Sequence, residues 1–93
     1  MTTRSVRALR QALLAKWFRR SDSHHQWYRL HVAGEATKVK TFLSHGIAEY
    51  GDKLLSDVAR QLHLSKQELL DFIDCRLSAE AYVALLLERR VLD

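Results

Sequence analysis

Residues 55–74 have the sequence LSDVARQLHLSKQELLDFID, which predicts two short helices separated by a tight turn. Ser65 and Glu68 have the spacing of a capping box, in which the serine hydroxyl accepts from the Glu68 N–H and the carboxylate accepts from the Ser65 N–H. A helix-start signal directly after a turn predicts a new helix. Apolar residues recur on one face of each predicted helix, namely Val58, Ala59 and Leu62, then Leu69, Phe72 and Ile73.

This two-helix unit resembles the helix-turn-helix of bacterial and phage repressors, over about a fifth of the chain. That family usually has glycine at the first turn position, where this sequence has His63. The resemblance implies that residues 53–75 present their second helix to the DNA major groove. Lys66 and Gln67 would then approach base edges, since glutamine pairs bidentately with adenine, and Ser65 and Lys66 would contact phosphate.

The outward face of the second predicted helix is acidic, and phosphates repel acidic side chains. This pattern supports a hypothesis of a different class, a protein-binding regulator such as an anti-activator, an antitoxin-like inhibitor or an adaptor. Its basic partner would meet the charged ring around a leucine that is formed by Glu68, Leu70, Asp71 and Asp74.

The composition favours an all-α fold in a single domain, residues 1–93. The chain has no proline and three glycines, and 47% of its residues are hydrophobic. We therefore expect a compact bundle of five to six short helices that contains the helix-turn-helix. The expected helices span 4–20 (within a basic N-terminal segment 1–20), 26–33, 36–50, 53–62, 66–75 and 79–91.

Segment 26–33 is the ambiguous one. Trp27, Leu30 and His31 suit a helix, whereas Tyr28, Leu30 and Val32 suit a strand, and helix is preferred because the neighbouring segments are predicted to be helical. Adjacent aromatic residues cannot both point inward on one helix, so either Trp27 or Tyr28 is expected to face a partner or a second subunit.

The positive charge is concentrated in the N-terminal half. Residues 1–51 contain nine Lys and Arg against three Asp and Glu, whereas residues 52–93 contain six against eight. A basic N-terminal helix would supply most of the salt-dependent affinity for double-stranded DNA. Binding of RNA through the same arginines is a weaker hypothesis. The cationic side chains assigned to DNA here are Arg4, Arg7, Arg10, Arg19 and Arg20.

No pattern in the sequence predicts an enzyme, a metal site or a cofactor. The five histidines include no pair at the four-residue helical spacing of a metal site, and the lone cysteine, Cys75, is expected to be a buried, inert thiol. A single cysteine also suits a reducing cytoplasm. No run of 18 apolar residues exists, so no membrane span is predicted.

The last predicted helix, 79–91, has a broad apolar surface for a terminal helix. Tyr82, Leu85 and Leu86 are therefore expected to help form a homodimer. Trp17 and Phe42 are expected to lie in the core. The function predicted from the sequence is a small, homodimeric, sequence-specific DNA-binding repressor, with the protein-binding regulator as the alternative.

Overall fold

The computed structural model describes residues 2–22, 26–44 and 46–92. Within these residues the fold is a mixture of helices and antiparallel sheets, so the prediction of an all-α bundle is wrong. The elements, in chain order, are β1 (Arg4–Ser5), α1 (Val6–Ala15), β2 (Phe18–Asp22), β3 (Gln26–Val32), β4 (Glu35–Leu43), β5 (Glu49–Tyr50), α2 (Asp52–Gln61), α3 (Lys66–Ile73) and α4 (Ala79–Glu88).

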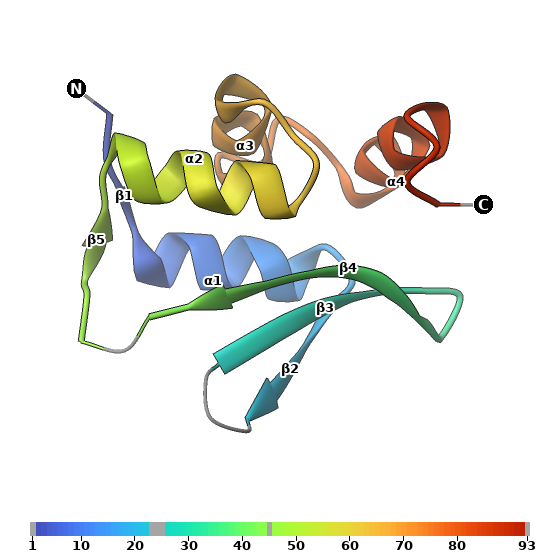
Figure 1. Cartoon of the computed structure of the whole chain (residues 1–93), viewed down its shortest axis with the longest axis horizontal. Helices are drawn as coiled ribbons and strands as arrows, with labels where there is room; N and C mark the ends of the chain where they lie inside the picture. Colours follow the sequence, from blue (N-terminus) through green and yellow to red (C-terminus); the bar gives the residue numbers. More distant parts are fainter. Residues whose placement is uncertain (1, 23–25, 45, 93) are drawn as a thin grey trace.

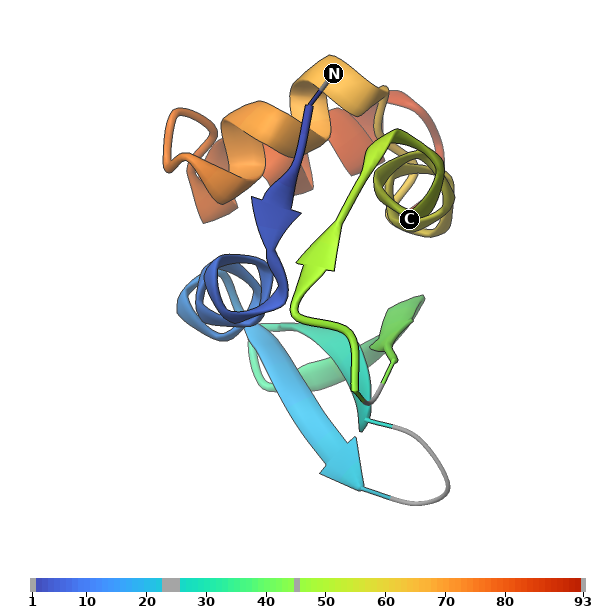
Figure 2. The ribbon, with the colours of Figure 1, turned by 90° about the vertical axis from the view of Figure 1, so that its left-hand side faces the viewer.

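The three longer strands form one antiparallel sheet in the order β2-β3-β4, and the short strands β1 and β5 pair separately. Figure 1 shows the three-stranded sheet at the bottom of the molecule, α1 directly above it, and α3 at the top. Figure 2 shows the same layers from the side, with every helix on one side of the sheet. The other side of the sheet, which we call the outer face, is not covered by a helix.

The alternation of side chains in β3 and β4 explains why strands replace the helices predicted for 26–33 and 36–50. In β3, Tyr28 and Leu30 are fully buried, and their neighbours are only half-buried. In β4 the fully buried residues are Val39, Thr41 and Leu43. This period of two places one side of each strand against the helices, which is the strand alternative that residues 26–33 already offered.

The predicted N-terminal helix 4–20 is shorter than expected because the chain turns sharply after α1. Trp17 has a φ of 73°, a left-handed conformation that ends the helix, and its carbonyl accepts from the His31 N–H at 2.9 Å. Phe18 then begins β2. Trp17 is 40% exposed, so its prediction as a core residue is wrong.

The two helices and the turn predicted for residues 53–75 are confirmed as α2 and α3. Both hydrogen bonds of the capping box are present, from the Glu68 N–H to Ser65 Oγ at 3.1 Å and from the Ser65 N–H to Glu68 Oε1 at 2.8 Å. In the turn, the Leu64 N–H donates to the Ala59 carbonyl at 2.8 Å, and the His63 N–H donates to the Arg60 carbonyl at 3.1 Å. This pair of bonds is a Schellman motif.

The same motif ends α3 and α4, and in none of the three is the left-handed residue a glycine. The residues that take its place are His63, Cys75 and Arg90, with φ values of 62°, 63° and 59°. Because a Cβ makes this conformation unfavourable, each helix end retains some backbone strain.

Replacing His63 by glycine is expected to stabilise the fold by about 0.5–1 kcal/mol, since the left-handed strain would be removed and the His63 side chain is exposed. Urea denaturation followed by circular dichroism would measure the change. His63→Ala is the matched control, because alanine also removes the imidazole but keeps the Cβ. Equal stabilisation by both substitutions would show that strain at this φ is not the cause.

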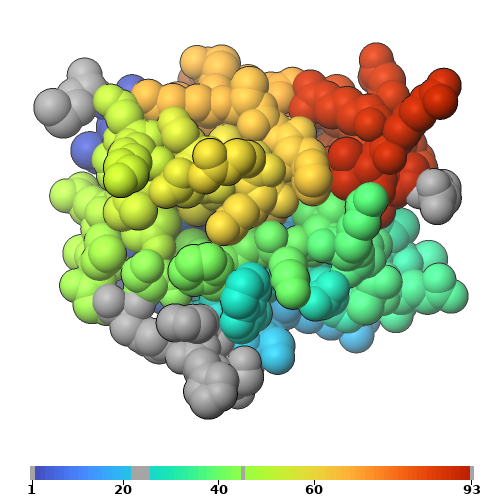
Figure 3. Space-filling model, in the orientation of Figure 1, coloured from blue at the N-terminus to red at the C-terminus, as the bar shows by residue number. Residues whose placement is uncertain are grey.

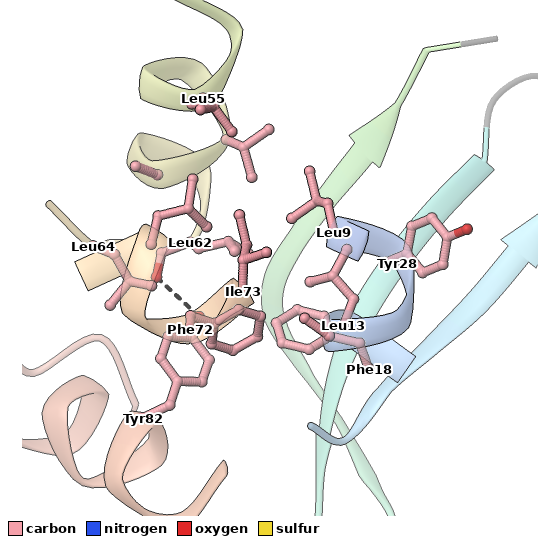
Figure 4. Packing of buried hydrophobic residues seen from close by; sticks show 14 of the residues in the cluster. Leu9, Leu13, Phe18, Tyr28, Leu55, Leu62, Leu64, Phe72, Ile73 and Tyr82 are labelled. Carbon is pink, nitrogen blue, oxygen red and sulfur yellow. Dashed lines mark hydrogen bonds between the residues drawn. The ribbon is translucent and has the colours of Figure 1, made fainter. Parts of the chain in front are cut away.

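The core lies between the helices and the sheet (Figure 4). Leu9 and Leu13 of α1 lie beside Tyr28 of β3, and Phe72 of α3 lies between them and Tyr82 of α4. The buried Tyr82 hydroxyl donates to the Leu62 carbonyl at 2.9 Å, and its burial raises the pKa of this hydroxyl. One hydrophobic core therefore connects the sheet with α2, α3 and α4.

Candidate functional site

The outer face of the sheet carries a row of three cations from three different strands. Arg19 of β2 lies opposite Arg29 of β3, and Arg29 lies opposite Lys40 of β4. Residues paired in this way have side chains on the same face and about 4.5–5.5 Å apart at Cβ. Like charges at directly opposed positions destabilise a sheet, so this cationic row requires an explanation beyond folding.

The neighbouring row is aromatic and polar. Ser21, Trp27 and Phe42 are paired across the same three strands. The Trp27 and Phe42 rings are 5.0 Å apart between centroids, and Lys40 Nζ lies over the Trp27 ring at 4.9 Å from its centroid. Neither row contains an acidic residue. A depression of about 250 Å3 lies between the rows, and it is lined by Ser21, Trp27, Arg29 and Lys40.

An irregularity in the pairing of β3 with β4 holds Arg29 in place. Arg29 is paired with Lys40, but His31, two residues later, is paired with Ala36, four residues earlier on β4. Arg29 Nη1 donates to the Thr37 carbonyl at 2.7 Å, and the Thr37 hydroxyl donates to the Leu30 carbonyl at 2.9 Å. Such irregularities redirect side chains. Here one guanidinium nitrogen is fixed on the backbone, which orients the others.

This surface therefore combines an aromatic ring with three cations that form no ion pair among the described residues, beside a shallow hollow on the open side of the sheet. In the space-filling view of Figure 3, β4 and part of β3 are seen in the lower half of the molecule, and α2, α3 and α4 are seen in the upper half. The ligand that this combination suits is an anion with planar groups.

The DNA contacts predicted at the start of α3 have intramolecular roles. Ser65 caps the helix, and Lys66 forms an ion pair with Asp52 at the start of α2, lowering the pKa of that carboxyl. Gln67 is exposed, and its Nε2 lies 3.3 Å from Asp71 Oδ1. The Lys66–Asp52 ion pair connects α3 with α2. Ser65 and Gln67 are exposed, whereas Lys66 is half-buried.

The predicted arginine contacts are dispersed over the molecule. Two of the three Arg4 side-chain nitrogens, Nε and Nη2, donate to the Asp74 carboxylate at 3.0 and 2.8 Å, which connects β1 with the end of α3. Arg10 Nε donates to the Tyr28 hydroxyl at 3.0 Å, on the side of the sheet that faces the helices. Arg7 is exposed on α1, Arg20 lies on β2 with the register of the inner face, and Arg19 belongs to the outer face. The structure does not bring these arginines together beside Lys66.

The acidic partner-binding face proposed for α3 is also largely engaged within the chain. Arg89 holds the Glu68 carboxylate in an ion pair with an N–O distance of 2.5 Å, and this contact lowers the pKa of Glu68 to about 2. Asp74 is paired with Arg4, which lowers the pKa of Asp74. Leu70 and Asp71 are half-buried. A basic partner would have to displace these internal contacts.

Two of the three residues predicted for a dimer contact belong to the core. Tyr82 and Leu86 are fully buried, so they are not available at the surface, whereas Leu85 is half-buried. The exposed apolar residue of α4 is Leu87, at 47%, which lines a groove of about 690 Å3 between α4 and the β3–β4 turn. A homodimer stays a prediction.

Other predictions concern cysteine, histidine and the membrane. Cys75 is exposed, so the prediction of a buried thiol is wrong. In the described part of the chain, no three His, Cys, Asp or Glu side chains are grouped so that they could hold a metal ion. His24, His25 and His45 lie outside the described residues. None of the described helices is long and apolar enough to cross a membrane.

Tyr28 is buried and Trp27 lies on the outer face, because successive side chains of a strand point to opposite faces. The expectation for these two residues was argued for a helix, so its premise is wrong, and a contact of Trp27 with a partner or a second subunit stays a prediction.

Of the other residues of the outer face, Arg19 was among the cations assigned to DNA, whereas Arg29 and Lys40 were missed. Phe42 was expected in the core and is only half-buried. The signal that could have revealed them is the alternation of Lys38, Lys40 and Phe42 with Val39 and Thr41, which is the pattern of a strand with one basic side.

Comparison with protein-family models, with curated proteins and with solved structures gave no match.

Proposed function

We propose that this chain binds nucleic acid through the outer face of its three-stranded sheet. The observation that carries the proposal is the cross-strand row Arg19–Arg29–Lys40, directly beside Trp27 and Phe42, with no acidic residue in either row. A basic surface with aromatic rings suits a polynucleotide, because phosphates need cations and bases need flat apolar surfaces.

The electrostatic repulsion within the row Arg19–Arg29–Lys40 supports this proposal. Three cations side by side repel one another, and only part of that repulsion is relieved, by the Thr37 carbonyl on Arg29 and by the Trp27 ring under Lys40. A polyanion would neutralise the row and release the condensed counterions that surround it. Binding would therefore be favoured most strongly at low salt.

Sequence-specific binding of double-stranded DNA by α3 is a competing proposal. The arrangement of α2 and α3, two short helices joined by a tight turn, supports it. The sheet is favoured because Lys66 and Glu68 are held by Asp52 and Arg89, whereas the three cations of the sheet face have no acidic partner in their rows. Under this view α2 and α3 cover and stabilise the core behind the binding surface.

The test is the salt dependence of binding to fluorescently labelled oligonucleotides, measured by anisotropy. We expect the logarithm of affinity to fall with the logarithm of salt with a slope of about −2, since three cations each contribute about 0.7 on a single strand. Affinity that does not change with salt, or no binding at 50 mM salt, would rule the proposal out. If Lys66→Ala with Gln67→Ala removes binding while Arg29→Glu with Lys40→Glu does not, α3 is the interface instead.

A further inference from the structure

Trp27 lies on the middle strand of the outer face, and its surroundings indicate which form of nucleic acid this face binds. Its ring is half-buried on the middle strand and tilted by 53° against the ring of Phe42. The ammonium of Lys40 lies over the same indole. Trp27 is thus positioned by an aromatic neighbour and covered by a flexible, charged side chain.

The cover over Trp27 is easily removed. A cation–π contact at an exposed site is weak, whereas an ammonium bonded to a phosphate is a charge-assisted hydrogen bond. Lys40 is exposed and lies directly opposite Arg29, so a phosphate held by Arg29 is within reach of Lys40 on the neighbouring strand. Movement of Lys40 to that phosphate uncovers the indole at the moment that a polynucleotide arrives.

Only an unpaired base can use the uncovered ring. In a duplex the bases are stacked on each other and present their edges in the grooves, whereas in a single strand the planar face of a base is free to stack on an aromatic side chain. We propose that the outer face selects unpaired polynucleotides, with one base stacked on Trp27 in the position that Lys40 occupies in the free protein. This inference rests on the proposed function and adds the class of ligand.

The tryptophan itself provides the probe. The chain contains two tryptophans, and Trp17 lies at the end of α1, so Trp17→Phe leaves Trp27 as the one emitting indole. We expect an eight-nucleotide single strand to quench Trp27 emission and the corresponding duplex to leave it unchanged. Parallel RNA and DNA strands show whether the sugar matters, since stacking on Trp27 is common to both.

Removal of the Trp27 indole should weaken the binding of single strands much more than the binding of duplexes. Trp27→Ala is expected to weaken single-strand binding by about 5- to 100-fold and to change duplex binding by less than about twofold, because stacking contributes for the unpaired base alone. Urea denaturation of the variant confirms that it is folded. If it is not folded, the emission experiment on the Trp17→Phe protein still decides the question.

Lys40→Gln tests the proposed movement. In the free protein this variant should increase the quenching of Trp27 by acrylamide, because the cover is lost. With a single strand it should lower the salt slope by about 0.7, because one phosphate contact is lost. Lys53→Gln on α2 removes the same charge from an exposed position. This control should change neither the acrylamide quenching of Trp27 nor the salt slope of single-strand binding.

The outcomes are distinguishable. Equal quenching by duplex and single strand, or equal loss of both on Trp27→Ala, would overturn the selection of unpaired strands and leave the sheet as a nucleic-acid surface. Absence of binding to any polynucleotide would instead overturn the proposed function itself.

Discussion

Replacing Arg29 and Lys40 together by glutamate is expected to lower the affinity for a ten-nucleotide strand by about 100-fold at 0.1 M salt. Each cation contributes about fivefold at this salt concentration through counterion release, and two new carboxylates add repulsion. The salt slope should fall by about 1.4 at the same time. Anisotropy of a labelled strand, titrated at several salt concentrations, measures both quantities.

The matched control changes the same charge on the opposite side of the molecule. Lys53 and Arg60 are exposed on α2, and their replacement by glutamate alters the net charge by as much as the sheet variant does. The exposed Arg60–Asp57 pair that this removes contributes little to stability. If the α2 variant loses as much affinity as the sheet variant, net charge rather than the outer face governs binding.

The location of the binding surface could not be derived from the sequence, for a physical reason. Arg19, Arg29 and Lys40 lie ten or more residues apart in the chain, and only the register of three strands makes them neighbours. The charge bias of residues 1–51 was visible in the sequence, and it indicated that an acidic partner would meet this half of the chain, which stays a prediction. It could not indicate that Arg4 would instead be bonded to Asp74.

The predicted secondary structure was right where its signals were local and wrong where they were not. The capping box at Ser65 and the apolar period of α2 and α3 act within one or two turns, so tertiary context did not override them. In residues 36–50, the apolar residues fit a helical period, while Val39, Thr41 and Leu43 fit a strand. Pairing with β3 settled that ambiguity, and a contact with a distant segment is absent from any local window.

The contacts of Phe72 within the core predict that its loss would destabilise the fold more than any of the other substitutions proposed. Phe72 is fully buried, and its ring is 6.1 Å from Phe18 at the start of β2 and 5.2 Å from Tyr82 of α4, both in edge-on arrangements. The buried ammonium of Lys16 lies 4.9 Å from the centroid of the Phe72 ring and donates to the Phe72 carbonyl at 2.7 Å. One side chain thus connects α1, the sheet, α3 and α4.

Phe72→Ala is therefore expected to cost about 3–5 kcal/mol, a large part of the 5–15 kcal/mol that stabilises a typical domain. The lost ring leaves a cavity in the core and removes the aromatic surface beside the buried ammonium of Lys16. In urea the midpoint should fall by about 2–3 M. Leu87→Ala, on the 47% exposed leucine of α4, should change stability by less than about 0.5 kcal/mol. A loss below about 1 kcal/mol on Phe72→Ala would mean that the helices and the sheet are stabilised independently, because a shared core cannot lose its central ring at so small a cost.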